Sequence, residues 1–256
     1  MEVEPKYTFL PVPEKHYPGL SDKNVAQLIQ KWGLNLMIQN FVFNEPFHQY
    51  HKYLLAEAFF KDNAVSKHLK IWDGKYSFSE EGIVANEVEI NQIPCTVLSM
   101  NFFEKLKDPE NNIIYNSGSI RQKCEEQIDG IFVSDNLRKM LLDEESDEYR
   151  LFSKTERAEF IFKLFQMLIL GGEYCQYEDQ LEPYLECTKK IYKDLVRVHK
   201  LEDTNTLTIS TIVLEVIAKK DEAYFPRNPT HKQNIGFLLI NRNTREITTL
   251  LHQFGT

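Results

Sequence analysis

Glycine is scarce in this sequence, with 10 glycines in 256 residues, and the only closely spaced pair is Gly171-Gly172. Loops that cradle a nucleotide's phosphates need several glycines between a strand and a helix, as in GxGxxG and GxxxxGK[ST]. Neither pattern occurs, and the glycine pair follows a predicted helix. We therefore expect no nucleotide bound through such a loop, and no other cofactor.

Cysteine is also rare and is not arranged for a metal. Structural zinc sites use ligands paired at short spacing, and the sequence contains no CxxC motif. We expect the thiols to be reduced and buried, as in a cytosolic protein. The four cysteines are Cys95, Cys124, Cys175 and Cys187.

No segment is typical of a signal peptide or a membrane span. The first 13 residues carry charges and three prolines, whereas a signal peptide needs a basic start and an apolar stretch of about 7–15 residues. The most apolar run, at 160–170, is too short to cross a bilayer. We expect a soluble, intracellular chain that does not bind a membrane.

The charge balance disfavours binding to nucleic acid. The chain has 30 basic and 38 acidic residues, a net charge of −8, and no dense cluster of Lys and Arg. Affinity for a phosphate backbone comes largely from such clusters, which release counterions. We therefore expect no nucleic-acid partner. The hydrophobic fraction of 42% is sufficient for a real core in a chain of this length.

Hydrophobic patterns and turn signals predict both strands and helices in the N-terminal half. The stretch 53–60 fits either a helix or a buried strand. The other predictions are an edge strand or extended arm at 7–13, strands at 36–43, 88–90 and 95–98, and helices at 21–32 (capped by Ser21), 99–106 (capped by Ser99), 118–127 and 135–142.

The clearest single element is a helix over 153–170. Ser153 and Glu156 form a capping box, in which each side chain satisfies the other's free backbone amide. Residues 160–170 are apolar on nearly every side of the helix, which indicates burial on nearly every side. Gly171-Gly172 then supplies a left-handed exit. We predict that this helix is central to the fold.

The C-terminal quarter changes to β character. A helix at 183–193 precedes alternating apolar and polar runs, and the last two runs are joined by a loop at 241–245 of hairpin length. The predicted strands lie at 195–198, 207–218, 235–240 and 246–252. Together with the central helix they predict an α+β fold: an extended N-terminal arm at 1–20 and a single domain at 21–256 with a C-terminal antiparallel sheet.

Few residues are grouped in a way that suggests catalysis. His48 and His51 lie three apart and, with Glu57, would suit a metal, but in a polar, Tyr-rich stretch they also suit a surface. Cys175 lies among acidic residues, which raise the pKa of a thiol and make it a poor nucleophile. An enzyme that gathers His48, His51, Cys175 and Glu178 into one pocket is the alternative to a binding protein.

The segment 170–179 is the most unusual in the chain, because it turns at two glycines and then places aromatic and acidic groups together. Tyrosine gains contact area at small entropic cost, so such a segment suits a protein interface. In the other interpretation the tyrosines pack on the core and the acids cap the next helix. The candidate interface residues are Tyr174, Tyr177, Glu178, Asp179, Tyr184 and Tyr192.

Five stretches of the sequence resemble the cilia- and flagella-associated protein 300 family. The resemblance runs in order and spacing from about residue 20 to the end, whereas the residues before Ser21 and those at 71–87 match poorly. The stretches are FFKD at 59–62, PCTVLSMNFF at 94–103, LGGEYCQYED at 170–179, PYLE at 183–186 and TKKIYKDLV at 188–196.

The resemblance implies a factor for ciliary motility, located in the cytoplasm and in the cilium or flagellum. It implies a role in the cytoplasmic assembly or ciliary delivery of outer and inner axonemal dynein arms. The implied partners are other dynein axonemal assembly factors and, less directly, intraflagellar transport proteins. The resemblance brings no enzymatic activity, no cofactor and no site residues. A structural component of the axoneme is the alternative within the same setting.

Overall fold

A computed structural model describes residues 5–13, 15–201 and 205–255 of the chain. The contacts divide the chain into two compact units. Unit 1 comprises Met1–Tyr17, Leu34–Cys95 and Leu195–Thr256, and unit 2 comprises Pro18–Gly33 and Thr96–Asp194. The expected division into an arm at 1–20 and a domain at 21–256 stays a prediction.

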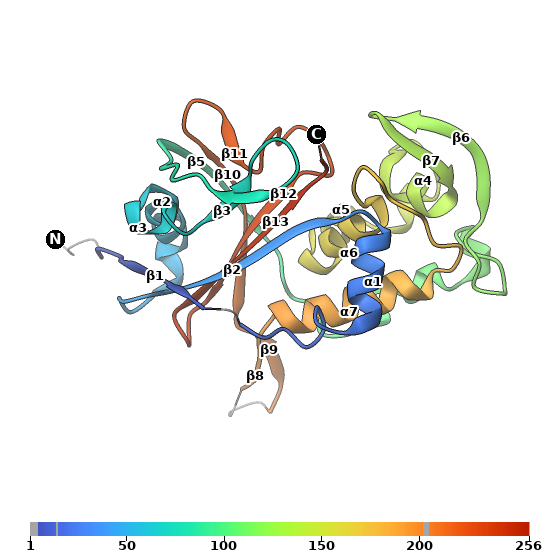
Figure 1. The fold of residues 1–256 in the computed structure, drawn as a ribbon. Coiled ribbons are helices and arrows are strands. Elements are labelled where there is room, and N and C mark those ends of the chain that lie inside the picture. Colours follow the sequence, from blue (N-terminus) through green and yellow to red (C-terminus); the bar gives the residue numbers. More distant parts are fainter. Residues whose placement is uncertain (1–4, 14, 202–204, 256) are drawn as a thin grey trace. The chain divides into compact units, whose positions relative to one another are not determined.

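Unit 1 is built on a seven-stranded sheet in which all pairs are antiparallel. Its strands are β1 (Phe9–Val12), β2 (Asn35–Phe43), β5 (Glu87–Ile93), β10 (Thr211–Lys219), β11 (Ala223–Phe225), β12 (Ile235–Asn241) and β13 (Glu246–Gln253). The order is β1-β2-β13-β12-β10 (Figure 1). β5 pairs with the other edge of β10. β11 pairs with Ala218 and Lys219 at the end of β10, on the same edge as β12, because β5 occupies the opposite edge at these two residues. The predicted C-terminal antiparallel sheet is confirmed, and the stretch predicted at 7–13 is indeed an edge strand.

The hairpin of β12 and β13 follows the prediction closely. Asn241 pairs with Glu246 across the turn, and the Asn241 side chain accepts a hydrogen bond of 3.1 Å from the amide of Asn243. Arg245 takes a positive φ of 53°. The asparagine thus supplies the turn chemistry that the loop sequence indicated.

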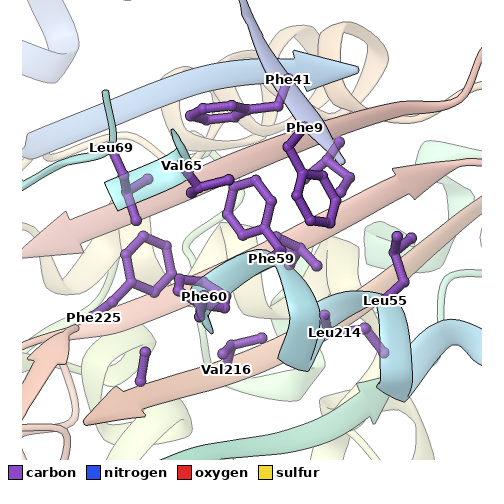
Figure 2. Close-up of a cluster of buried hydrophobic side chains, with 14 of the residues drawn as sticks. Phe9, Phe41, Leu55, Phe59, Phe60, Val65, Leu69, Leu214, Val216 and Phe225 are labelled. Atoms are coloured by element: carbon purple, nitrogen blue, oxygen red, sulfur yellow. The ribbon is translucent and has the colours of Figure 1, made fainter. Parts of the chain in front are cut away.

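The helix α2 (Lys52–Lys61) covers one face of this sheet, which decides the ambiguous stretch at 53–60 in favour of a helix. Figure 2 shows its side chains directed at the strands. The ring of Phe59 meets those of Phe9 and Phe41 edge to face, with centroids 5.3 and 4.9 Å apart. The ring centroid of Phe60 lies 5.0 Å from that of Phe225. Leu55, Phe59 and Phe60 repeat at helical spacing, so one helix face buries them all.

Short elements complete unit 1, and four of them pair into separate two-stranded sheets. They are η1 (Gln49–His51), α3 (Asn63–Ser66), β3 (Lys70–Trp72) with β4 (Phe78–Glu80), and β8 (Val198–Lys200) with β9 (Leu207–Ile209).

Unit 2 is mainly helical, with one hairpin. Its elements are α1 (Lys23–Lys31), η2 (Met100–Leu106), η3 (Pro109–Asn111), β6 (Gln122–Ile128), β7 (Ile131–Asp135), α4 (Asn136–Leu142), η4 (Tyr149–Leu151), α5 (Lys154–Ala158), α6 (Phe160–Leu170) and α7 (Glu182–Leu195). In the part of the chain that the structure describes, no helix is both long and apolar enough to cross a membrane.

The buried central helix is confirmed as α6, which buries every apolar residue from Phe160 to Leu170. The predicted capping box is present on α5, where the Ser153 and Glu156 side chains each accept from the other's backbone amide. The helix is not continuous, however, because Glu159 is extended at ψ 140° and separates α5 from α6. The carboxylate of Glu159 accepts bonds of 3.0 and 2.6 Å from the amide and hydroxyl of Thr96, which stabilises the break.

The helix predicted at 118–127 is wrong, because these residues lead into the hairpin of β6 and β7. Asp129 and Gly130 both take positive φ, 51° and 79°, as a tight two-residue hairpin turn requires. Ile131 and Val133 are buried while Phe132 is exposed, which is the alternation of a strand. The Asp-Gly pair was the overlooked signal.

Three smaller predictions also need correction. Residues 95–98 have no regular secondary structure, so the strand predicted there is wrong. Leu195 ends α7 rather than beginning a strand, and the following strand starts at Val198. The cap of α1 is Asp22, not Ser21, because the Asp22 carboxylate accepts from the amides of Asn24 and Val25.

Candidate functional site

The segment 171–179 is held against the C-terminal end of α1, within unit 2. The amide of Gly172 donates to the carbonyl of Trp32 over 2.9 Å, and the amide of Gln176 donates to the carbonyl of Lys31 over 2.9 Å. Gly171 has a φ of 63°, and a methyl group there would lie 2.6 Å from the Trp32 carbonyl oxygen and against the Cys175 sulfur. Glycine is therefore required at this turn, both for its backbone conformation and for its lack of a side chain.

Glu178 fastens the other end of the segment to the same helix. Its carboxylate lies 2.7 Å from Nζ of Lys31 and accepts a 3.2 Å hydrogen bond from the indole of Trp32. Its amide donates to the hydroxyl of Tyr184 over 3.0 Å. The segment is thus fixed at both ends by hydrogen bonds, and one of its two candidate acids is already engaged inside the molecule.

Arg138 lies beneath the segment and is fully buried. Its guanidinium pairs with Asp135 and donates to the carbonyl of Ile169 and the hydroxyl of Tyr184, each over 2.9 Å. The ring of Tyr177 stacks on it, with the guanidinium carbon 3.3 Å from the ring centroid. Burial lowers the pKa of Arg138, but Tyr184 and Asp135 more than offset this and raise it, so the guanidinium stays charged.

The six predicted interface residues divide by exposure. Tyr184 is completely buried, and its ring stacks on that of Trp32 with centroids 4.6 Å apart. Tyr192 is also buried, and its hydroxyl donates to the carbonyl of Val97 over 2.9 Å. These two tyrosines pack in the core, as in the second interpretation, and do not reach a partner in this conformation. Tyr177 and Glu178 are partly exposed, whereas Tyr174 is 79% exposed and Asp179 is exposed. Whether these residues form an interface stays a prediction.

The cysteine of the segment is not poised for catalysis. Burial is the main influence on Cys175 and raises its pKa to about 11, although Arg138 opposes the shift. Burial likewise raises the pKa of Cys187 to about 12. Both thiols are therefore protonated at neutral pH and are weak nucleophiles. The expectation of four buried thiols is correct only for Cys187: Cys95 and Cys175 are partly buried, and Cys124, on β6, is exposed.

The residues of the alternative enzyme site belong to two different units. His48 and His51 lie in unit 1, with ring centroids 6.1 Å apart, and Cys175 and Glu178 lie in unit 2. Among the described residues, no three His, Cys, Asp or Glu side chains come together in a way that could hold a metal ion. The pairing of His48 and His51 with Glu57 is thus not assembled as a metal site in this structure.

Sequence reasoning missed a groove between α1 and α7, which lie side by side in unit 2 (Figure 1). Its volume is about 420 Å³. It is lined by Asn24, Val25, Leu28, Glu182, Pro183, Glu186, Cys187 and Lys190. Five of these residues belong to the same stretch, 174–192, that was singled out for its tyrosines. No sequence signal reveals the groove, because it depends on two helices that are far apart in the sequence becoming neighbours.

Comparison with known proteins identifies the family. The family model described as "Cilia- and flagella-associated protein 300" matches residues 6–252. The chain belongs to this family. The match includes the two stretches, before residue 21 and at 71–87, in which the motifs showed little resemblance. The family therefore accounts for both compact units.

Two curated relatives carry the same family name. A protein of Paramecium tetraurelia is 32% identical over 237 residues, which cover 92% of this chain and 89% of the relative. A protein of Chlamydomonas reinhardtii is 28% identical over 250 residues, 96% of this chain and 97% of the relative. No solved structure matches the chain. Membership supports a role associated with cilia and flagella, in a family that is not named as one of enzymes.

Proposed function

We propose that this protein is a non-enzymatic adaptor that aids the cytoplasmic assembly or the ciliary delivery of outer and inner axonemal dynein arms. Its proposed partners are other dynein axonemal assembly factors and intraflagellar transport proteins. It works in the cytoplasm and in the cilium or flagellum, and it binds proteins rather than nucleic acid or membrane. Membership of a cilia- and flagella-associated family supports this setting.

The observation that carries the binding role is the display of Tyr174 on a fixed turn. The side chain is 79% exposed. The backbone of Tyr174 lies on Gly33, where an added methyl group would come within 3.1 Å of its carbonyl carbon. The flanking amides of Gly172 and Gln176 are bonded to the end of α1. The turn is therefore ordered before any partner arrives.

A large aromatic side chain on a pre-ordered turn is suited to act as an interface anchor. Association normally costs free energy to order the side chains and loops of the interface, and a fixed turn avoids much of that cost. Tyrosine is among the residues most enriched at the positions that dominate binding energy. Asp179, exposed five residues further along, adds a charge that a basic partner group can meet.

The test replaces the two exposed residues of this surface. Tyr174→Ala and Asp179→Lys are expected to reduce the recovery of dynein axonemal assembly factors with the tagged protein by tenfold or more, which corresponds to about 1.4 kcal/mol of binding free energy. The melting temperature should stay within about 2 °C of the wild type, because neither side chain is buried. Co-purification from ciliated cells with quantitative mass spectrometry measures the recovery.

The matched control is Tyr76→Ala, which removes a tyrosine that is 84% exposed in unit 1. It should leave the recovery of partners unchanged. Equal recovery with the wild type, Tyr174→Ala and Asp179→Lys would show that this surface does not bind the proposed partners.

A further inference from the structure

The groove between α1 and α7 has apolar walls that are not filled by the unit itself. Val25 and Cys187 form its buried floor, with exposures of 2% and 1%. Leu28 from α1 and Pro183 from α7 are only partly buried and border the opening. On each helix the two apolar residues are three or four positions apart, so they lie on the same helix face.

The size of the groove fits a few side chains rather than a whole helix. Its 420 Å³ lies in the lower part of the range of about 300–1,000 Å³ that ligand pockets occupy. Because side chains of two neighbouring helices form its walls, the groove suits the insertion of two or three apolar side chains from a helix lying across it. Amphipathic helices bind in this way through residues at i, i+3, i+4 and i+7.

The charged residues around the groove indicate which charges a bound helix must carry beside its apolar side chains. Glu182 and Glu186 are four residues apart on α7, so two like charges face each other on the helix surface. Nζ of Lys190, which could pair with Glu186, instead lies 3.0 Å from the carboxylate of Asp22 beside α1. Glu186 pairs with Lys189, whose Nζ lies 3.3 Å from the Glu186 carboxylate.

Glu182 is exposed, and the ion pairs seen among the described residues do not include it. Lys189 and Lys190 each already pair with another carboxylate, so the rim at this end of the groove keeps a net negative charge at Glu182. A basic group supplied from outside would relieve the repulsion between Glu182 and Glu186 and gain a charge-assisted contact.

We infer that the α1–α7 groove binds an amphipathic helix of a partner protein, with two apolar residues three or four apart in the groove and a Lys or Arg beside Glu182 and Glu186. This inference rests on the proposed adaptor function and adds a second contact surface to it. Tyr174 does not line the groove. The two surfaces can therefore be tested separately.

The test is a selection of helical 14-residue peptides, displayed on phage, against the full-length protein. Enriched peptides should carry the apolar spacing and the basic flank. Their synthetic versions should bind at least tenfold more weakly to the double variant Glu182→Lys/Glu186→Lys and to Leu28→Trp, which fills the groove. Fluorescence anisotropy measures each dissociation constant, and the melting temperature of each variant checks that it is folded.

A charge exchange makes the result specific. A peptide in which the basic flank is changed to Glu should lose affinity for the wild type and regain it on Glu182→Lys/Glu186→Lys. The double variant Glu110→Lys/Glu125→Lys makes the same change of net charge at exposed positions of unit 2 outside the groove. It should bind the original peptide as the wild type does.

Either of two results would overturn the inference: no peptide enriched above background, or enriched peptides that bind the groove variants and the wild type alike. Tyr174→Ala should leave the affinity for the peptides unchanged. If Tyr174→Ala loses the assembly factors while the peptides bind the groove variants as they bind the wild type, the groove is not a binding site but the adaptor function is supported. If the peptides need the groove while every variant recovers all partners, the groove binds helices but the proposed adaptor function is contradicted.

Discussion

Replacing Arg138 with methionine should destabilise unit 2 severely, because Arg138 is buried beneath the segment 171–179 and its charge is paired there. The side chain is fully buried, and Asp135, its ionic partner, is 2% exposed. The introduced methionine would fill most of the volume but would leave the Asp135 carboxylate without a counter-ion. The change would also remove the hydrogen bonds to the Ile169 carbonyl and the Tyr184 hydroxyl.

The magnitude follows from the burial. Removing one partner of a buried ion pair costs about 3–5 kcal/mol, because the remaining charge is uncompensated. Asp135 keeps one hydrogen bond, from the backbone amide of residue 138, which holds the cost within that range. Against a typical unfolding free energy of about 5–15 kcal/mol, the loss is a large fraction of the total.

Urea unfolding followed by tryptophan fluorescence measures the effect. Trp32 is stacked on Tyr184 and reports on unit 2, so the measurement is made in a Trp72→Phe background, where Trp32 is the only tryptophan. The double variant Arg138→Met/Asp135→Asn should lose less stability than the sum of the two single variants, since it leaves no lone buried charge.

The control for this experiment is Arg150→Met. Arg150 pairs with Asp147 in solvent, with side-chain exposures of 65% and 96%. Its removal should cost about 0–1 kcal/mol, as is usual for surface pairs. A cost of less than about 1 kcal/mol for Arg138→Met would refute the view that its ion pair and hydrogen bonds hold the segment 171–179 in place.

Two further predictions concern the turn and the capping box. Gly171→Ala should lower the free energy of unfolding in urea by about 2–5 kcal/mol, because the alanine would be strained at a positive φ and would overlap Trp32 and Cys175. The control Gly82→Ala, at a similar φ of 66° but with open space around it, should lower it by only about 1–2 kcal/mol. Equal losses for the two variants would contradict the close approach at Gly171. Burial raises the pKa of Glu156, but hydrogen bonds from Lys105 and Ser153 outweigh it and lower the pKa below 4.5. The stability that this carboxylate contributes is present above its unfolded pKa and is lost as the pH falls through its folded pKa. Between pH 5 and about pH 3, the free energy of unfolding of Glu156→Gln should therefore fall less than that of the wild type. Parallel curves for the two proteins would contradict this prediction.

Elements defined by local chemistry were predictable from the sequence. The capping box of Ser153 and Glu156 and the apolar run after it predicted a buried helix because both signals act over a few residues. The turn after Asn241 was predictable for the same reason. Glu159 shows the limit of this approach, because the break in the helix is stabilised by Thr96, which is 63 residues away in the sequence.

The candidate site was predictable only in part. The motif at 170–179 correctly indicated an unusual turn, but composition cannot separate Tyr174, which is exposed, from Tyr184, which is buried on Trp32. That distinction depends on where α1 packs. Arg138 was missed for a related reason, since an arginine in a short amphipathic helix normally indicates a solvated position. Only the tertiary structure brings its partners together.

The most direct test of the proposed function is the dynein content of axonemes. Quantitative mass spectrometry of axonemes from ciliated cells that lack this protein, compared with the same cells after its re-expression, measures outer-arm and inner-arm heavy chains against tubulin. The adaptor account predicts that both arm types fall severalfold without the protein and recover with it, while the protein itself is far below arm stoichiometry in salt-extracted axonemes. Normal arm content in its absence, or its own retention at near-stoichiometric levels, would contradict the account.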